Sequence, residues 1–251
     1  MGPVLSGLYL STDTQPCDAE NLLFYNVGAS QFKQATRWGL RFERGFAKPP
    51  PTGSGPPSYE HYYRYEFVPS ERPFQHWPHL RVLACWTEVP CPIRSSNSSP
   101  AQIWWALKQA APGMESFLSS CTPSQNFAVR LVLHLPSGEK VNLAALAKPL
   151  FDGAIAAFHY DPSPDPAVVS RLSQELHAAP SEVHRSLANS SLAVLGSRPL
   201  VRPRARGVQW NPADHLCIAG QLIRQDAARG PAWRLSGELL SVVARGAPPH
   251  R

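Results

Sequence analysis

A lysine and an aspartate four residues apart, Lys148 and Asp152, stand in a stretch of chain that holds no other Asp, Glu, Lys or Arg, VNLAALAKPLFDGAIAAFH. On a helix this spacing places both side chains on one face, where they can form an ion pair. A lysine can contact a phosphate, and an aspartate can ligate a divalent metal. The alternative is a solvated surface pair on a core helix, because such pairs are common and weak.

A second group of oxygen-bearing side chains lies near the start of the chain. Asp18, Glu20 and Asn21 occur in CDAENLLFYN, just before an apolar run. One interpretation is a helix N-cap followed by first-turn charges. The other is acidic metal ligation, to which Asp161 and Asp152 would add carboxylates from the second half of the chain.

Arginines are concentrated in SRPLVRPRARGVQW, a segment of a basic chain. The chain has 24 Lys and Arg against 18 Asp and Glu, a net charge of +6. If the segment is extended, Arg202, Arg204 and Arg206 lie on one side of it, and together with Arg198 they are candidates for phosphate contacts. A charged edge strand that resists aggregation explains them equally well.

A third polar cluster precedes an apolar strand-like run in NPADHLCIAGQLI. Asn211, Asp214 and His215 have the chemistry of a tight turn. The functional alternative is a strand-edge cluster in which His215 acts as a base or ligand together with Asp214.

Several familiar sites are missing from the sequence. It has no Walker-type glycine loop, HExxH, Gly-x-Ser-x-Gly or paired-cysteine metal motif. We therefore expect no cofactor, except Mg²⁺ or Mn²⁺ if the acidic residues form a metal site. The cysteines are odd in number and not closely paired, which predicts free thiols: Cys17, Cys85, Cys91, Cys121 and Cys217. With no apolar run long enough for a membrane span and no secretory signal pattern, we expect a cytoplasmic protein that does not bind membranes.

The elements that would position these residues follow from apolar periodicity and cap residues. A strand at 127–135 precedes a helix within 141–161, whose apolar stripe comprises Leu143, Leu146, Leu150, Phe151, Ile155 and Phe158. Further helices are predicted at 99–111, 165–178 and 181–189, and further strands at 7–11, 39–44, 61–68, 80–89, 198–201, 216–224 and 233–243. The pattern predicts an α+β fold with mixed or antiparallel sheets, packed helices and two halves, 1–120 and 121–251, that have a similar make-up.

The Lys148 segment resembles the core motif of RusA-type Holliday-junction resolvases. That motif is Asp-x-Asp-Asn-Leu, a lysine two residues later, often a proline, and an aspartate four residues after the lysine; Leu146, Lys148, Pro149 and Asp152 match it. The motif's two aspartates and asparagine are replaced by Asn142, Ala144 and Ala145, and only Asp161 roughly matches the family's later acidic pair.

The first half carries a complementary fragment of the same motif. Asp18 to Leu22 resembles Asp-x-Asp/Glu-Asn-Leu, with Phe24 at the lysine position. The resemblance implies a resolvase-like fold with either a degenerate site or one composite site.

These observations predict a prokaryotic, non-catalytic nucleic-acid-binding protein or an accessory subunit of a DNA- or RNA-processing or defence assembly, with protein partners. Its contact residues would be Lys148, Arg198, Arg202, Arg204 and Arg206. The first alternative is a metal-dependent endonuclease that uses Asp18, Glu20, Asp152 and Asp161. The second is a structural interaction subunit that binds no nucleic acid.

Overall fold

The computed structural model describes residues 2–25, 27–50, 59–93, 98–111, 114–116, 126–136, 138–226 and 232–244. The strands are β1 (Val4–Ser11), β2 (Gly39–Gly45), β3 (His61–Val68), β4 (His79–Pro90), β5 (Glu115–Ser116), β6 (Phe127–Leu135), β7 (Val201–Pro203), β8 (Val208–Trp210), β9 (Cys217–Asp226) and β10 (Arg234–Val242). The α-helices are α1 (Pro100–Gln109), α2 (Leu143–Ala157), α3 (Pro166–Leu176) and α4 (Pro180–Ala188), and two short helical turns are η1 (Asn21–Tyr25) and η3 (Asp214–Leu216). The predicted α+β class is confirmed.

Both halves of the chain contribute to one sheet of eight strands in the order β3-β1-β2-β9-β6-β10-β4-β5. In the first half β1 pairs with β2 in parallel and with β3 antiparallel. In the second half β6 pairs with β9 in parallel and with β10 antiparallel. The two three-strand units meet through the antiparallel β2–β9 pair. The same strand pattern therefore occurs twice, and the halves share a sheet rather than building separate ones.

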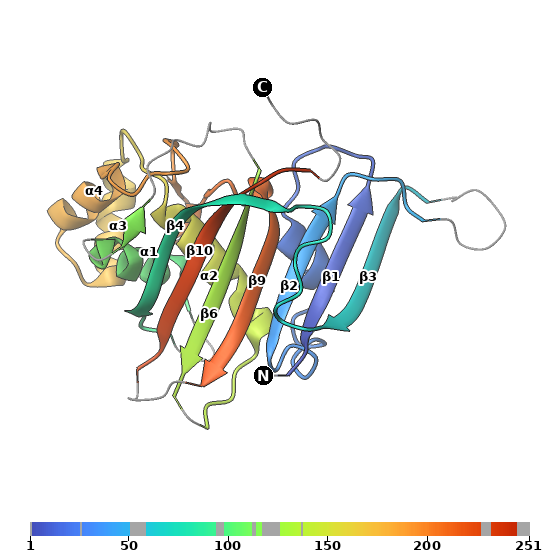
Figure 1. Cartoon of the computed structure of the whole chain (residues 1–251). Coiled ribbons are helices and arrows are strands. Elements are labelled where there is room, and N and C mark those ends of the chain that lie inside the picture. The colour runs from blue at the N-terminus through green and yellow to red at the C-terminus, as the bar shows by residue number, and fades with distance from the viewer. Residues whose placement is uncertain are drawn as a thin grey trace.

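Helices α1 and α2 lie on one face of this sheet, and α3 and α4 pack beside α1 rather than on the sheet (Figure 1). The other face is crossed by the segment between β3 and β4, whose Phe74 and Trp77 pack in a small apolar cluster with Ile218 and Leu240. Arg41 lies under this segment, where its guanidinium stacks on Phe74 and donates to the carbonyls of residues 72 and 73. A buried arginine is tolerated on this face because backbone carbonyls accept from both Nη atoms and Glu43 lies 3.6 Å from Nη2.

Helix α2 forms where the apolar stripe predicts it. Asn142 is its N-cap, and its side chain accepts a hydrogen bond from the Ala145 amide. All six predicted stripe residues are buried, and they form part of the main core. Because the stripe faces the sheet, Lys148 and Asp152 point to another side of the helix.

Helix α1 holds α2 at close range. It begins as predicted, with Ser99 as the N-cap and Pro100 in the first turn. Gly153 of α2 lies against it: a Cβ on Gly153 would be 2.6 Å from Ile103 Cβ and 2.7 Å from the Pro100 carbonyl oxygen. Only glycine permits this approach, which fixes the part of α2 that carries Asp152.

Some predicted elements differ from the structure. The strand predicted at 198–201 is instead β7, Val201–Pro203, which pairs only with β8 in a separate hairpin. The turn of this hairpin interrupts the alternation that would have aligned Arg202, Arg204 and Arg206. Helix α4 starts at Pro180 with Ala179 as a cap that makes no side-chain hydrogen bond, so Ser181 is not its cap.

The described part of the chain bears on the predictions of unpaired cysteines and of no membrane span. Cys17, Cys85, Cys91 and Cys217 form no disulfide, as predicted, whereas Cys121 and most of the predicted boundary at 112–125 lie outside the described residues. Within the described part of the chain, no helix has the length and apolar character needed to cross a membrane.

Candidate functional site

The two fragments that carry acidic and basic side chains meet in space. Each sits in the connection between two parallel strands: Asp18 between β1 and β2, and Lys148, Asp152 and Asp214 between β6 and β9. Lys148 Nζ lies 3.0 Å from Asp18 Oδ2, 3.3 Å from Asp152 Oδ2 and 3.5 Å from Asp214 Oδ2. We call Asp18, Glu20, Lys148, Asp152 and Asp214 the composite cluster.

The composite cluster holds four carboxyl groups and a single lysine. Burial raises the pKa of Asp152 to about 7, with Lys148 opposing the shift and Asp214 and Asp18 adding to it. Burial also raises the pKa of Asp18, again against the pull of Lys148. Burial by itself would lower the pKa of Lys148, but Asp152, Asp18 and Glu20 outweigh it and raise that pKa. One lysine does not compensate four carboxyl groups.

Glu20 is the most deeply buried member of the composite cluster. It is only 3% exposed, and its Oε1 has no hydrogen-bond partner. Burial raises its pKa to about 8, the charge of Asp18 adds to the shift, and Lys148 opposes it. A buried carboxylate oxygen without a donor is costly, so this position favours either a proton or a cation that the protein itself does not supply.

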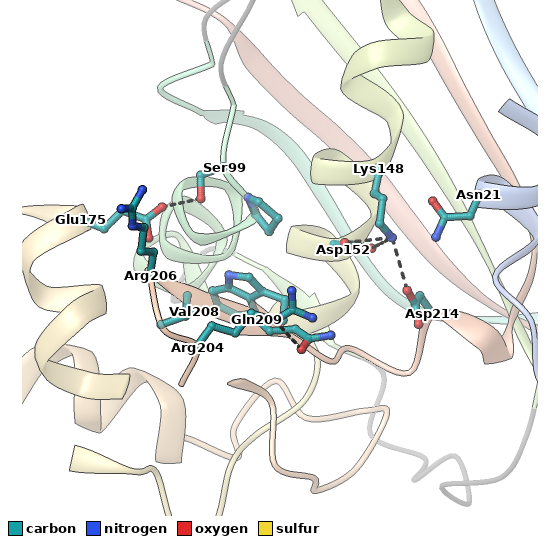
Figure 2. A pocket seen from close by; sticks show the side chains of 13 residues that line it. Asn21, Ser99, Lys148, Asp152, Glu175, Arg204, Arg206, Val208, Gln209 and Asp214 are labelled. Carbon is teal, nitrogen blue, oxygen red and sulfur yellow. Dashed lines mark hydrogen bonds and ion pairs between the residues drawn. The ribbon is translucent and has the colours of Figure 1, made fainter. Parts of the chain in front are cut away.

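Asn21 holds the Asp18 carboxylate in place through two hydrogen bonds. Its amide N–H and its Nδ2 both donate to Asp18, at 3.2 and 2.6 Å, which is the capping role that the sequence allowed. Its own Oδ1 is buried and has no partner. Asn21 therefore lies beside Lys148 with an unused oxygen acceptor (Figure 2).

An open cavity of about 620 Å³ adjoins the composite cluster. Lys148, Asp152, Asp214 and Asn21 line one side, and Arg204, Arg206 and Gln209 line the other (Figure 2). Trp210, the residue after Gln209 in β8, also lines the cavity. The remaining lining residues are Ser99, Pro100, Glu175, Gly207 and Val208. One cavity thus combines an acidic end with a basic and aromatic end.

The acid predicted at 161 is not part of this arrangement. Asp161 is buried between two loops, where its Oδ1 accepts from the Ser163 amide and its Oδ2 from the Leu200 amide, both at 3.1 Å. These bonds make Asp161 a structural residue. Asp214, which the sequence placed in a different cluster, takes its place beside Lys148.

The other predicted site residues also differ in whether they line the cavity. Arg198 and Arg202 do not line the cavity, although Arg204 and Arg206 do. Asn211 shapes its loop, with its amide N–H donating to the Leu200 carbonyl, and the His215 amide donates to Asp214 Oδ1. Of Asn211, Asp214 and His215, only Asp214 lines the cavity.

The donor chemistry of the composite cluster fits a divalent cation, because Mg²⁺ and Mn²⁺ prefer carboxylate and amide oxygens. The unpartnered Glu20 Oε1 and Asn21 Oδ1 add to that fit. Among the described residues, however, no three His, Cys, Asp or Glu side chains gather closely enough to hold a metal in this conformation. The Lys148 ammonium group lies between the carboxylates, so a metal would have to draw them together and displace it.

Replacing Glu20 with glutamine is expected to stabilise the metal-free protein at neutral and alkaline pH. The folded-state pKa of Glu20, about 8, lies above its ordinary value of 4.5. Stability is therefore lost as the pH rises from the unfolded value to the folded one, and glutamine removes that loss. One pKa unit corresponds to about 1.4 kcal/mol. If half of the difference between the two Glu20 pKa values acts on stability, the free energy of unfolding of Glu20→Gln exceeds that of the wild type by about 2 kcal/mol at pH 8 and equals it at pH 4.

Urea denaturation in EDTA at both pH values measures this difference. Glu43 offers a matched control, because it is 4% exposed but accepts hydrogen bonds from the amides of Gln75 and His76 and lies 3.6 Å from Arg41. Glu43→Gln should destabilise the protein. A loss of stability in Glu20→Gln at pH 8 would show that Glu20 is satisfied in the folded state.

Sequence reasoning missed Trp210 and Gln209 as lining residues and did not connect Asp214 with Lys148. The available signal was the position of Asp214 just before a strand that follows a helical connection. A parallel crossover returns the chain to the edge where the preceding strand began, so a residue just before the returning strand lies near the second half of the connecting helix, which in α2 carries Asp152 one turn from Lys148.

Comparisons with known proteins give no assignment. No family model matches the chain, and neither the curated proteins nor the solved structures include a significant match.

Proposed function

We propose that the chain is a metal-dependent nuclease whose active site is the composite cluster. One observation carries the proposal: two fragments of a resolvase-like motif, more than a hundred residues apart, lie in contact. The Asp18-x-Glu20-Asn21 fragment meets the Lys148-x-x-x-Asp152 fragment through the 3.0 Å contact of Lys148 Nζ with Asp18 Oδ2. The first fragment supplies the acidic residues that the second lacks, and the second supplies the lysine that the first lacks.

The residues of the composite cluster have distinct roles in this proposal. Asp18, Glu20, Asp152 and Asp214 would hold the divalent cation, which would activate water and stabilise charge on the phosphate. Lys148 would contact a phosphate oxygen. Asn21 keeps Asp18 in position through its two hydrogen bonds.

Cleavage assays test the proposal. The purified protein is incubated with labelled branched, duplex and single-stranded DNA and RNA in Mg²⁺, in Mn²⁺ and in EDTA. We expect metal-dependent cuts that Asp18→Asn abolishes. Asp226→Asn is the matched control, because Asp226 is an exposed acid paired with Arg224 on β9, away from the cavity. Intact substrate under every metal condition would overturn the proposal.

A second candidate is a non-catalytic nucleic-acid-binding subunit of a processing or defence assembly. The observation that favours it is that Lys148 fills the space between the carboxylates and that no metal-competent trio exists among the described residues. This candidate predicts binding whose affinity falls steeply with salt, without cuts in any metal. Binding with cleavage favours the nuclease, and a protein partner recovered without nucleic acid binding favours a structural subunit.

A further inference from the structure

The hairpin of β7 and β8 forms the wall of the cavity opposite the composite cluster. Its turn carries Arg204 and Arg206 (Figure 2), and its second strand ends with Gln209 and Trp210. This hairpin is not part of the main sheet, so its role in the fold is local. Because it lines the same cavity as the composite cluster, a ligand bound at the cluster would also contact the hairpin.

The turn is held in a defined conformation. Arg171 of α3 donates from Nη1 to the Gly207 carbonyl at 2.7 Å and to the Arg204 carbonyl. Gly207 has a φ of +73°, which glycine adopts without strain. Arg204 Nε donates to Gln209 Oε1 at 2.9 Å across the hairpin. Such bracing lowers the conformational cost of presenting two arginines to a ligand.

The two arginines have charge available for an anion. Within the described ranges, neither Arg204 nor Arg206 forms an ion pair. Glu175 lines the same cavity, but its Oε1 accepts a hydrogen bond from Ser99 Oγ. A guanidinium with free donors facing a cavity is well suited to phosphate oxygens.

Trp210 adds an aromatic surface beside these arginines. It is half-buried and lines the cavity, and its ring lies 5.5 Å from that of Trp104, tilted by 50°. Trp104 is fully buried in the core and supports Trp210 from behind. The ring is thereby held in place for stacking with a planar group.

We propose that this wall binds an unpaired nucleotide: Arg204 and Arg206 take its phosphates and Trp210 stacks on its base. Bases within a duplex are stacked on both faces, whereas a base in a single strand, flap or branch point is free to stack on an aromatic ring. The substrate class is therefore nucleic acid with single-stranded nucleotides next to the cleaved bond. The inference deepens the proposed function and rests on it for the position of that bond.

Binding without metal tests the inference separately from cleavage. Fluorescent single-stranded and blunt duplex oligonucleotides are titrated in EDTA across a salt series. We expect single strands to bind at least about 10-fold more tightly than duplex. Loss of one or two phosphate contacts in the Arg204→Ala/Arg206→Ala double variant should reduce the salt slope by about 1, since each contact to a single strand contributes roughly 0.7.

The hairpin supplies its own control in Arg202, an exposed arginine of β7 outside the cavity. Arg202→Ala should bind single strands nearly as wild type. Trp210→Ala should weaken binding at least about 5-fold, and Trp210→Phe, which keeps a stacking surface, should retain most of the affinity. Equal effects of Arg202→Ala and the double variant, or equal binding of duplex and single strand, would overturn the inference.

The outcomes separate the two proposals. Metal-free binding that depends on Arg204, Arg206 and Trp210, but no cleavage in any metal, would remove the nuclease and leave the nucleotide-binding wall. Cleavage that depends on Asp18 but is unaffected by the hairpin variants would leave the nuclease and remove the wall.

Discussion

Replacing Asp214 with asparagine is expected to lower metal-dependent cleavage at least about 100-fold, which corresponds to about 2.7 kcal/mol of lost transition-state stabilisation. Asp214 lies 3.5 Å from Lys148, lines the cavity, and adds to the raised pKa of Asp18, Glu20 and Asp152. Asparagine keeps an oxygen that can accept from the His215 amide, so the turn is preserved while the charge is lost. Initial cleavage rates over a Mn²⁺ titration measure the effect.

The same titration separates lost affinity from lost chemistry. If Asp214 holds the metal, the variant needs a higher Mn²⁺ concentration and regains part of its rate there. Asp226→Asn should cleave as wild type at every concentration. Full activity of Asp214→Asn would mean that Asp18, Glu20 and Asp152 hold the metal without it.

Replacing Lys148 with methionine is expected to lower the free energy of unfolding by about 3 kcal/mol at pH 8 in EDTA, because three carboxylates then lose their partner. Without the lysine, the folded-state pKa of Asp152, already about 7, rises further above its unfolded value. An acid with a raised folded pKa costs nothing below the unfolded pKa, and its cost grows as the pH rises through the interval. The deficit should therefore be small near pH 4 and full at pH 8.

Arg130→Met is the matched control for this substitution. Arg130 has the same side-chain exposure as Lys148, 29%, but faces a single carboxylate, Glu238, at 3.0 Å. A pair of this kind contributes at most about 1 kcal/mol. The Arg130 guanidinium also lies 5.3 Å from the centre of the Phe74 ring, a contact that adds about 0.5 to 1 kcal/mol, so the loss in this control stays below that expected for Lys148→Met. Urea denaturation of both variants at pH 4 and pH 8 makes the comparison. A Lys148→Met deficit that does not change with pH would show that packing of the lysine stem, rather than its charge, stabilises the site.

Local sequence signals predicted the helices well. The apolar stripe of α2 and the Ser99-Pro100 start of α1 depend on spacing and on one cap residue, and both are confirmed. The hairpin at 201–210 was not predicted, because strands of three residues are too short to show an apolar periodicity. Its turn is held instead by Arg171 of α3, which donates to the carbonyls of Arg204 and Gly207. Short elements of this kind depend on distant partners.

The sequence by itself determined which residues could do chemistry: an acidic fragment at Asp18 and Glu20, a lysine and an acid one helical turn apart at Lys148 and Asp152, and a run of arginines. It also determined the helix that carries Lys148, because capping and apolar spacing act over a few residues. Short-range forces specify such features.

Only the tertiary structure decided that the fragments form one cluster, which includes Asp214 but not Asp161. It also decided that Arg204 and Arg206 line the cavity beside this cluster while Arg202 does not. The antiparallel pairing of β2 with β9 brings the two halves together, and the Gly153 contact with α1 sets the position of α2. These placements depend on contacts between residues far apart in the chain, which local spacing does not encode.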